Sequence, residues 1–318
     1  MSAIAFFLGA SWGKWGGLLR SISIAVGIFF AFFTLLPLQH PALNVSMRIY
    51  LGANVLLVLI GNWIGQKKAV KGMYIIIGWA IIPFVSVFLL AGIQGSELIP
   101  SVSTTFWGGL LVTFLLSAGG ILLSFPIGLI LALGRRSTLP VVKAFSTIFI
   151  ETVRGVPLIT ILFMFSIILA LFLPADSRID RLVRALMAVT FFSAAYTAEN
   201  VRGGLQAVPT GQIEAAKAVG MNGFQTMVFI VLPQALRAVL PAIVGQFISL
   251  FKDTTLVVIV GINDLLGIGR SIINSDPEFV QLQTEVYIFI ALIYWIFSYL
   301  MSLASRRLEA AMGVSSRL

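Results

Sequence analysis

The sequence has no cysteine and one histidine among its 318 residues. The missing cysteines exclude disulfide bonds, thiol chemistry and cysteine-based metal sites. His40 stands beside a proline in LQHPAL with no neighbouring partner for a proton relay, so we interpret it as a turn residue. The sequence also lacks the G-x-x-x-x-G-K-[ST] motif that cradles nucleotide phosphates. We therefore expect no catalytic residue, no bound metal and no cofactor on this chain.

Charged residues are also scarce, at 10% of the chain, while 59% is hydrophobic and the mean hydropathy is +1.04. Soluble domains carry roughly a quarter charged residues, and about 20 consecutive apolar residues cross a lipid bilayer. The sequence therefore predicts an all-α polytopic membrane protein. The net charge of +9 does not indicate nucleic acid, because the basic residues stand in small groups between apolar runs.

The apolar runs predict about eight transmembrane helices. Lys14 and Arg20 precede the first run as in a signal peptide, but the run is long and no cleavage site follows, so we expect a retained span. If the spans alternate, most basic loop residues share one side, which predicts that both termini are cytoplasmic. The expected spans are residues 19–38, 47–65, 73–92, 106–134, 142–173, 182–201, 233–251 and 285–305.

The chain divides near residue 100, at the polar stretch GIQGSELIPSVSTT. Residues 1–100 form an extension of three spans with almost no internal charge, and residues 101–318 form five spans with charges at membrane depth. No clear internal repeat is visible, which disfavours an inverted-repeat secondary transporter. In GASWGKWGG, Gly9, Gly13 and Gly17 offer a face for close helix packing, but we favour a plain interfacial anchor.

The loop at about 205–232, between spans six and seven, has internal structure. Thr210 suits a helix N-cap, and residues 212–219 are good helix formers. Gly220 suits the left-handed position that ends a helix. Asn222 and Gln225 resemble a capping box that starts a second helix. The pattern predicts two short helices with a bend at Gly220.

The second helix is expected to end at Pro233, which lacks an N–H and suits the start of the next span. Ala215, Ala216 and Ala218 give the first helix a low profile, which lets another protein surface approach. We therefore favour a docking element over an unpartnered amphipathic loop.

The motif E-A-A, three residues, G, nine residues, I-x-L-P resembles the signature loop of permease subunits of binding-protein-dependent ABC importers. The flanking stretches AAYTAENVRGGLQAVPTGQ and QFISLFKDTTLVVIVGINDLL, and IETVRGVPLITILF in the fifth span, look like the polar amino-acid uptake branch. The resemblance covers about residues 101–318, and residues 1–100 look like the extension of longer, eight-span members. The motif residues are Glu214, Ala215, Ala216, Gly220, Ile230, Leu232 and Pro233.

The resemblance implies a five-helix type I importer core and a multi-pass protein of the bacterial cytoplasmic membrane. It implies that the Glu214–Gly220 loop couples to one of two separate ABC ATPase subunits, which hold ATP and Mg. The other implied partners are a second permease, identical or homologous, a periplasmic or extracellular substrate-binding protein, and an amino acid as substrate. The alternatives are an ATP-independent secondary transporter or channel, and a non-translocating scaffold subunit.

Ionisable groups inside spans are costly and mark candidate sites. Glu151 and Arg154 lie three apart and are expected to pair on one helix face, just before a break at Gly155 and Pro157. A broken helix frees backbone groups that can line a polar cavity. This pair is equally consistent with a structural ion pair and with a part of the pathway or its inner gate.

Two further polar groups lie at the ends of spans. Glu199, Asn200 and Arg202 end the sixth span, and we expect Arg202 to snorkel towards the membrane surface. Lys252, Asp253 and Thr254 end the seventh span, where one ammonium and one carboxylate could match an amino-acid zwitterion; the alternative is a polar hinge. We expect residues 254–268 to be re-entrant or interfacial, broken by Gly261, Gly267 and Gly269.

Overall fold

The structure is a computed structural model that describes residues 2–15, 23–24, 27–28, 45–67, 103–172, 179–275 and 277–311. The chain separates into two compact units, residues 1–102 and 103–318. The expected third span, residues 73–92, lies outside the described residues, as does nearly all of the first.

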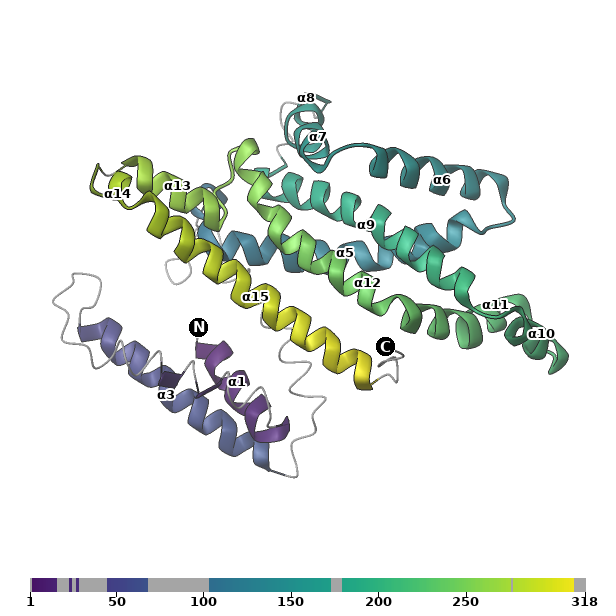
Figure 1. Cartoon of the computed structure of the whole chain (residues 1–318), viewed down its shortest axis with the longest axis horizontal. Helices are drawn as coiled ribbons and strands as arrows, with labels where there is room; N and C mark the ends of the chain where they lie inside the picture. Colours follow the sequence, from purple (N-terminus) through teal and green to yellow (C-terminus); the bar gives the residue numbers. More distant parts are fainter. Residues whose placement is uncertain are drawn as a thin grey trace, which may run out of the picture. The chain divides into compact units, whose positions relative to one another are not determined.

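The first unit contains two packed helices, α1 (Ser2–Trp15) and α3 (Val45–Gln66) (Figure 1). Their glycines face each other: a Cβ on Gly9 would overlap the Val58 backbone, and one on Gly61 would overlap the Phe6 backbone. Two helix backbones meet this closely only where side chains are absent. The preference for a plain interfacial anchor was therefore wrong for Gly9 and Gly13, which form a helix–helix contact with α3. Gly17 lies outside the described residues.

In the described part of the second unit the regular secondary structure is helical, with an isolated β-bridge between Gly109 and Asp264. Its elements are η2 (Thr104–Phe106), α5 (Gly109–Arg135), α6 (Pro140–Gly155), α7 (Leu158–Phe163), η3 (Met164–Ile168), α8 (Leu169–Phe172), α9 (Arg181–Ala207), α10 (Thr210–Ala218), α11 (Gly223–Gln225), η4 (Thr226–Val231), α12 (Leu232–Asp253), η5 (Thr254–Val260), α13 (Leu265–Ser275), α14 (Pro277–Gln281) and α15 (Gln283–Ala311).

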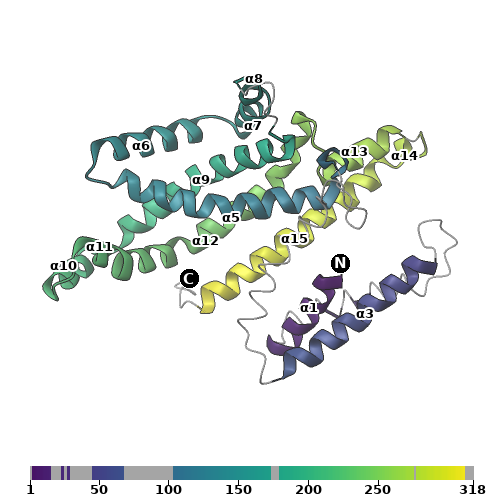
Figure 2. The ribbon, with the colours of Figure 1, turned by 180° about the vertical axis from the view of Figure 1, so that it is seen from behind.

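Helix α9 lies at the centre of this unit, in contact with α5, α6, α7 and α12 (Figures 1 and 2). Small side chains allow this close packing, and Ala185, Ala188, Ala194 and Ala198 are fully buried. Other helices, rather than lipid, cover much of α9, so it tolerates charged residues that a lipid-facing span excludes. By composition alone, α9 is too polar to be identified as a membrane span, unlike three other described helices.

Three described helices are long and apolar enough to cross a membrane: Gly109–Arg135, Gly223–Val260 and Gln283–Arg307. A fourth candidate is a broken pair, Pro140–Gly155 and Leu158–Ile168, bent by 109°. The break falls at Pro157, as expected, because proline ends the preceding helical turn. The expected count of eight spans is not established by these helices.

The stretch before Pro233 differs from the prediction. The second loop helix does not stop at Pro233 but continues through the π-helical segment η4 into α12, giving one helix from Gly223 to Val260. In η4 the Leu232 N–H donates to the Met227 carbonyl, five residues back. This wider turn makes room for the Pro233 ring, which would clash in a regular α-helix.

At the other end of α12, the 3₁₀ helix η5 ends at Gly261, whose φ of 76° lies in the left-handed region. The chain therefore turns there, as predicted. Gly267 and Gly269 do not break the chain, which corrects the prediction: both are buried inside α13. The Asp264 carboxylate accepts the Gly267 N–H at 2.8 Å and the Tyr294 hydroxyl at 2.9 Å, which caps α13 and ties it to α15.

Candidate functional site

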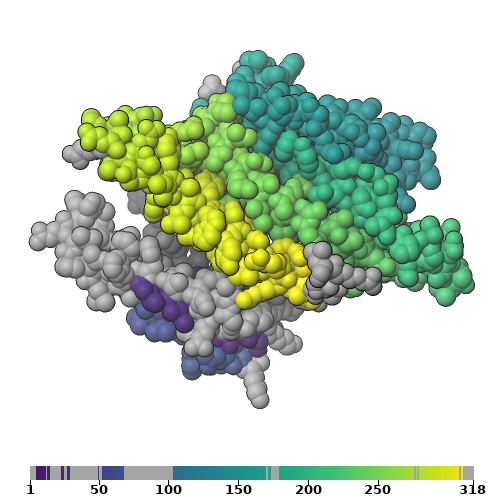
Figure 3. Space-filling view, viewed as in Figure 1, coloured from purple at the N-terminus to yellow at the C-terminus, as the bar shows by residue number. Residues whose placement is uncertain are grey.

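The loop that joins α9 to α12 forms a two-helix knob. Helix α10 ends at Ala218, and Gly220 follows with a φ of 83°. Asn222 and Gln225 form the predicted capping box, with both hydrogen bonds at 2.9 Å. One detail was wrong: Pro209 occupies the N-cap position, so Thr210 begins the helix. The knob stands out at one end of the unit (Figure 3).

The motif residues divide between the surface and the interior of this knob. Glu214 and Ala215 are exposed, while Ala216 is buried where α10 packs against η4. The knob also exposes two large apolar side chains, Val219 (76% exposed) and Phe224 (75%). The last three motif residues lie on the continuous helix behind α10, where Ile230 and Leu232 are half-buried and Pro233 is exposed.

A cluster of five charged side chains joins α5, α6 and α9. Arg135 of α5 pairs with Glu151 at 2.7 Å and with Glu199 at 3.4 Å. Glu199 of α9 also pairs with Arg154 at 3.5 Å and with Arg202. The predicted pairing of Glu151 with Arg154 on one helix face was wrong, because each binds a partner on another helix.

Arg202 donates two hydrogen bonds to the Glu199 carboxylate, one of them at 2.9 Å. Contrary to the prediction, Arg202 is not at a helix end, since α9 continues to Ala207; its expected snorkelling towards the membrane surface stays a prediction. The guanidinium carbon of Arg154 lies 5.7 Å from the centre of the Tyr196 ring. Arg154 thus links the charged cluster to the side of α9 that bears Tyr196.

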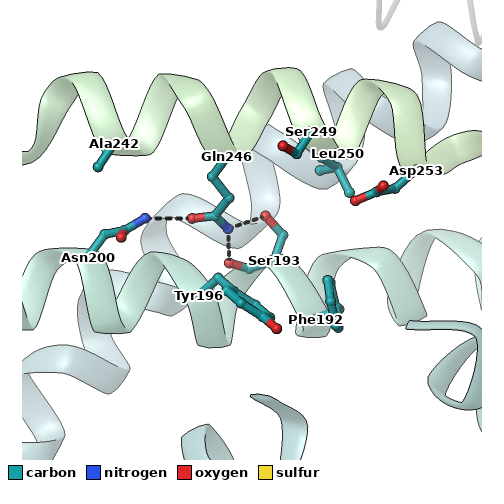
Figure 4. Close-up of a pocket in the computed structure, with 9 residues that line it drawn as sticks. All are labelled: Phe192, Ser193, Tyr196, Asn200, Ala242, Gln246, Ser249, Leu250 and Asp253. Atoms are coloured by element: carbon teal, nitrogen blue, oxygen red, sulfur yellow. Dashed lines mark hydrogen bonds between the residues drawn. The ribbon is translucent and has the colours of Figure 1, made fainter. Parts of the chain in front are cut away.

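A cavity of about 420 Å³ lies between α9 and α12 (Figure 4). Its volume is in the range of small-molecule sites. No residue of the break at 155–157 lines this cavity. The lining residues are Phe192, Ser193, Tyr196, Asn200, Ala242, Gln246, Ser249, Leu250 and Asp253.

Of the residues predicted at the end of α12, only Asp253 lines the cavity. Asp253 is half-buried and lines the cavity, whereas Lys252 is exposed and is absent from its lining. Thr254 is buried, and its hydroxyl donates to the Phe251 carbonyl at 2.8 Å. The charge of Lys252 acts on the Asp253 carboxylate, but the Lys252 side chain is not part of the cavity lining. The structure therefore does not place both charges in the cavity.

Sequence reasoning missed several residues of these two sites. The span pattern places Arg135 in a cytoplasmic loop, and its two partners lie on helices distant in sequence. Tyr196 and Gln246 were overlooked, although Gln246 is a lone amide within an apolar stretch, which is a usable signal. Within the described ranges, no group of three His, Asp or Glu side chains is placed to hold a metal ion.

Comparisons with known proteins identify the fold and the family. A family model described as "Binding-protein-dependent transport system inner membrane component" matches residues 124–314. A solved crystal structure of an amino acid ABC transporter with histidines matches with a TM-score of 0.58 and 30% identity, covering 64% of this chain and 92% of the other.

Two sequence relatives agree with that family. The inner membrane amino-acid ABC transporter permease protein YhdY of Escherichia coli K12 is 45% identical over 263 residues, 82% of this chain and 71% of the relative. The glutamate/glutamine/aspartate/asparagine transport system permease protein BztC of Rhodobacter capsulatus is 46% identical over 211 residues, 66% of this chain and 49% of the relative. The chain belongs to the family of inner-membrane components of binding-protein-dependent transport systems.

Proposed function

We propose that this chain is the transmembrane permease subunit of an ATP-driven importer of amino acids. The family match and the amino-acid relatives support the class, and the α10–α11 knob carries the proposal within this chain. ATP and Mg belong to two separate ATPase subunits. A second permease completes the pathway, a binding protein delivers the amino acid, and residues 1–100 add three further spans to a core of five.

The knob is built to move as a rigid body. Gly220 and the Asn222 capping box fix the turn between α10 and α11, and α10 packs against η4 behind it. Because Gly223–Val260 is one helix, a push on α10 is transmitted along it. Gln246 in the cavity lies 23 residues beyond Gly223, or about 35 Å at 1.5 Å per residue.

The motif residues have distinct roles in this proposal. Glu214 and Ala215 face the ATPase, since both are exposed on α10, and Ala216 holds α10 to η4. Ile230, Leu232 and Pro233 shape the helix that carries the movement. The cluster of Glu151, Arg154 and Glu199, with its bonds across three helices, joins α5, α6 and α9 as part of the inner gate.

The experiment is removal of the knob residues Glu214–Gly220, with a short Gly/Ser linker in their place. Co-purification with the ATPase and ATP-driven uptake of radiolabelled amino acids are then measured in proteoliposomes. We expect both to be lost while the permease still assembles in the membrane. A matched control is the triple substitution of exposed residues on the opposite end, at Asn274, Ser275 and Glu285. If the ATPase stays bound to the variant without the knob, the proposal fails.

A further inference from the structure

Helices α9 and α12 flank the knob, and at the knob end they are packed without a gap. A Cβ on Gly204 of α9 would lie 2.5 Å from the Ala235 carbonyl oxygen of α12. Ala235 is fully buried and belongs to one apolar cluster with Val201 and Leu205 of α9. Because close-packed interiors transmit displacement, a movement of this end of α12 moves α9 directly.

Farther from the knob, α12 has a weak point. Pro241 lies inside the helix, and its ring nitrogen carries no hydrogen to bond the carbonyl four residues earlier. Sharp bends in long helices concentrate at such prolines. Pro241 is also exposed, so no neighbouring helix encloses it and opposes a bend. A push from the knob would be absorbed at Pro241 unless the far half of α12 is anchored.

Beyond Pro241 a cavity, instead of close packing, lies between α12 and α9. The lining residues that α12 contributes run from Ala242 to Asp253. The largest buried side chain of this half, Phe251, stacks on Phe114 of α5 and packs against Phe297 of α15. The apolar contacts of Phe251 thus tie the far half of α12 to α5 and α15, and its link to α9 needs another contact.

Gln246 supplies that link across the cavity (Figure 4). Its amide nitrogen donates to the Ser193 carbonyl oxygen at 2.7 Å, to the Ser193 hydroxyl at 3.0 Å and to the Thr197 hydroxyl at 3.3 Å. Its amide oxygen accepts the Asn200 amide nitrogen at 2.8 Å. The three partners are four and three residues apart, which places them on one face of α9. One side chain thus fastens α12 to two turns of α9.

These hydrogen bonds resist separation of the two helices. Ser193 and Thr197 are buried, and a buried polar group that loses its partner is costly. The Ser193 carbonyl oxygen only accepts, which fixes the nitrogen of the Gln246 amide on the α9 side. Both ends of that amide are therefore bound to α9, and withdrawal of α12 would break several bonds at once.

We infer, on the basis of the proposed function, that Gln246 is a positioning residue for coupling. It ties the half of α12 beyond Pro241 to α9, so that a movement of the knob displaces both helices together and is not lost as a bend. The knob end of α12 moves with α9 through close packing, and the far half moves with α9 through Gln246. This role requires no contact between Gln246 and the transported amino acid.

The test is the number of amino acids taken up per ATP hydrolysed. It is measured with a mixture of radiolabelled amino acids for the complete complex in proteoliposomes, at saturating binding protein. Gln246→Leu removes the four bonds to α9. We expect uptake per ATP to fall by at least about fivefold, the low end of coupling between sites, while ATP hydrolysis continues. A merely structural defect would lower uptake and hydrolysis in proportion, and an unchanged ratio would overturn the inference.

Pro241→Ala separates coupling from contact with the transported amino acid. It restores a helical hydrogen bond at an exposed position, so α12 loses its weak point. Alone it should leave uptake per ATP unchanged. Combined with Gln246→Leu, it should restore uptake per ATP to within about twofold of wild type, because the two sites are coupled. A double variant that is as poorly coupled as Gln246→Leu would show that Gln246 does not act against a bend at Pro241.

A swapped pair is the rescue control. Gln246→Asn shortens the bridge by one methylene and should lower uptake per ATP. Adding Asn200→Gln returns that methylene from the α9 side and restores the bond between the two amides. We expect the swapped pair to couple better than Gln246→Asn alone, and no gain from the second substitution would contradict the bridge.

Spin labels test the inference without altering Gln246. The chain has no cysteine, so Val183→Cys on α9 and Ile259→Cys on η5, both at exposed positions, take labels selectively. The distance between the two labels should be the same in the nucleotide-free complex and in the complex trapped with ATP and vanadate. Separation of the labels on trapping would mean that the far half of α12 does not move with α9, and the inference would fail.

The unaltered complex separates this inference from the proposed function. If wild type takes up no amino acid with ATP, the proposed function fails. If wild type is coupled and Gln246→Leu is coupled equally well, the inference on Gln246 fails and the importer assignment stands.

Discussion

Replacing Gly220 tests whether the rigid turn of the knob transmits force. Its φ of 83° is a left-handed conformation, and no atom lies within 4 Å of the position that a Cβ would occupy. The penalty for a side chain is therefore local backbone strain and not a clash with a neighbour. Such strain costs about 1–2 kcal/mol for an ordinary residue and less for Asn.

That penalty shifts the local equilibrium between the ordered and the opened turn by roughly 5- to 30-fold. We expect ATPase activity coupled to transport in proteoliposomes to fall in the order Gly220, Gly220→Asn, Gly220→Ala, Gly220→Val. Hydrogen exchange of the α10 amides should rise in the same order. The β-branched side chain of Val is the least compatible with positive φ.

Gly211→Ala is the matched control for this series. Gly211 is also exposed on α10 with nothing within 4 Å of a Cβ, but its φ is not positive. Alanine there should leave coupling unchanged or slightly improve helix stability. If Gly220→Val coupled as well as wild type, or if Asn were as harmful as Val, a rigid left-handed turn would not be what transmits the force.

Further predictions concern the ion cluster and the first unit. Glu199→Gln weakens bonds to three arginines and should lower the free energy of unfolding by about 1–3 kcal/mol. Glu151→Gln changes a carboxylate that is 54% exposed and should lower it by about 0–1 kcal/mol. Equal losses of thermal stability in the two variants would contradict the central place of Glu199. Gly61→Leu should separate α1 from α3, because its side chain would overlap the Phe6 backbone. Hydrogen exchange of the α1 amides should then rise, and unchanged exchange would refute the packing.

Local rules predicted the knob because its structure is set within a few residues. Gly220, Asn222 and Gln225 act on their immediate backbone, and their roles follow from conformation and spacing alone. The break at Pro157 is local in the same sense. The predicted helix boundary at Pro233 was wrong because a π-helical segment accommodates the proline ring. The residue pattern carries no signal for such a segment.

Residue spacing along the sequence did not predict the contacts between helices. Glu151 and Arg154 fit the rule for a pair on one helix, yet Arg135 and Glu199 on adjacent helices offered them partners. A helix pair depends on how its neighbours pack, and a single sequence does not contain that information. The cavity was only partly predicted for the same reason. Asn200 and Asp253 stand out in the sequence as polar groups at the ends of spans, but the sequence does not show that Gln246 on another helix binds Asn200.

The most direct test of the importer assignment is uptake by the purified complex in proteoliposomes with a binding protein, with and without ATP. The account predicts amino-acid uptake that requires ATP hydrolysis and disappears when Glu214–Gly220 is replaced by a linker. Uptake driven by an ion gradient alone, or uptake that persists without the Glu214–Gly220 segment, would contradict it.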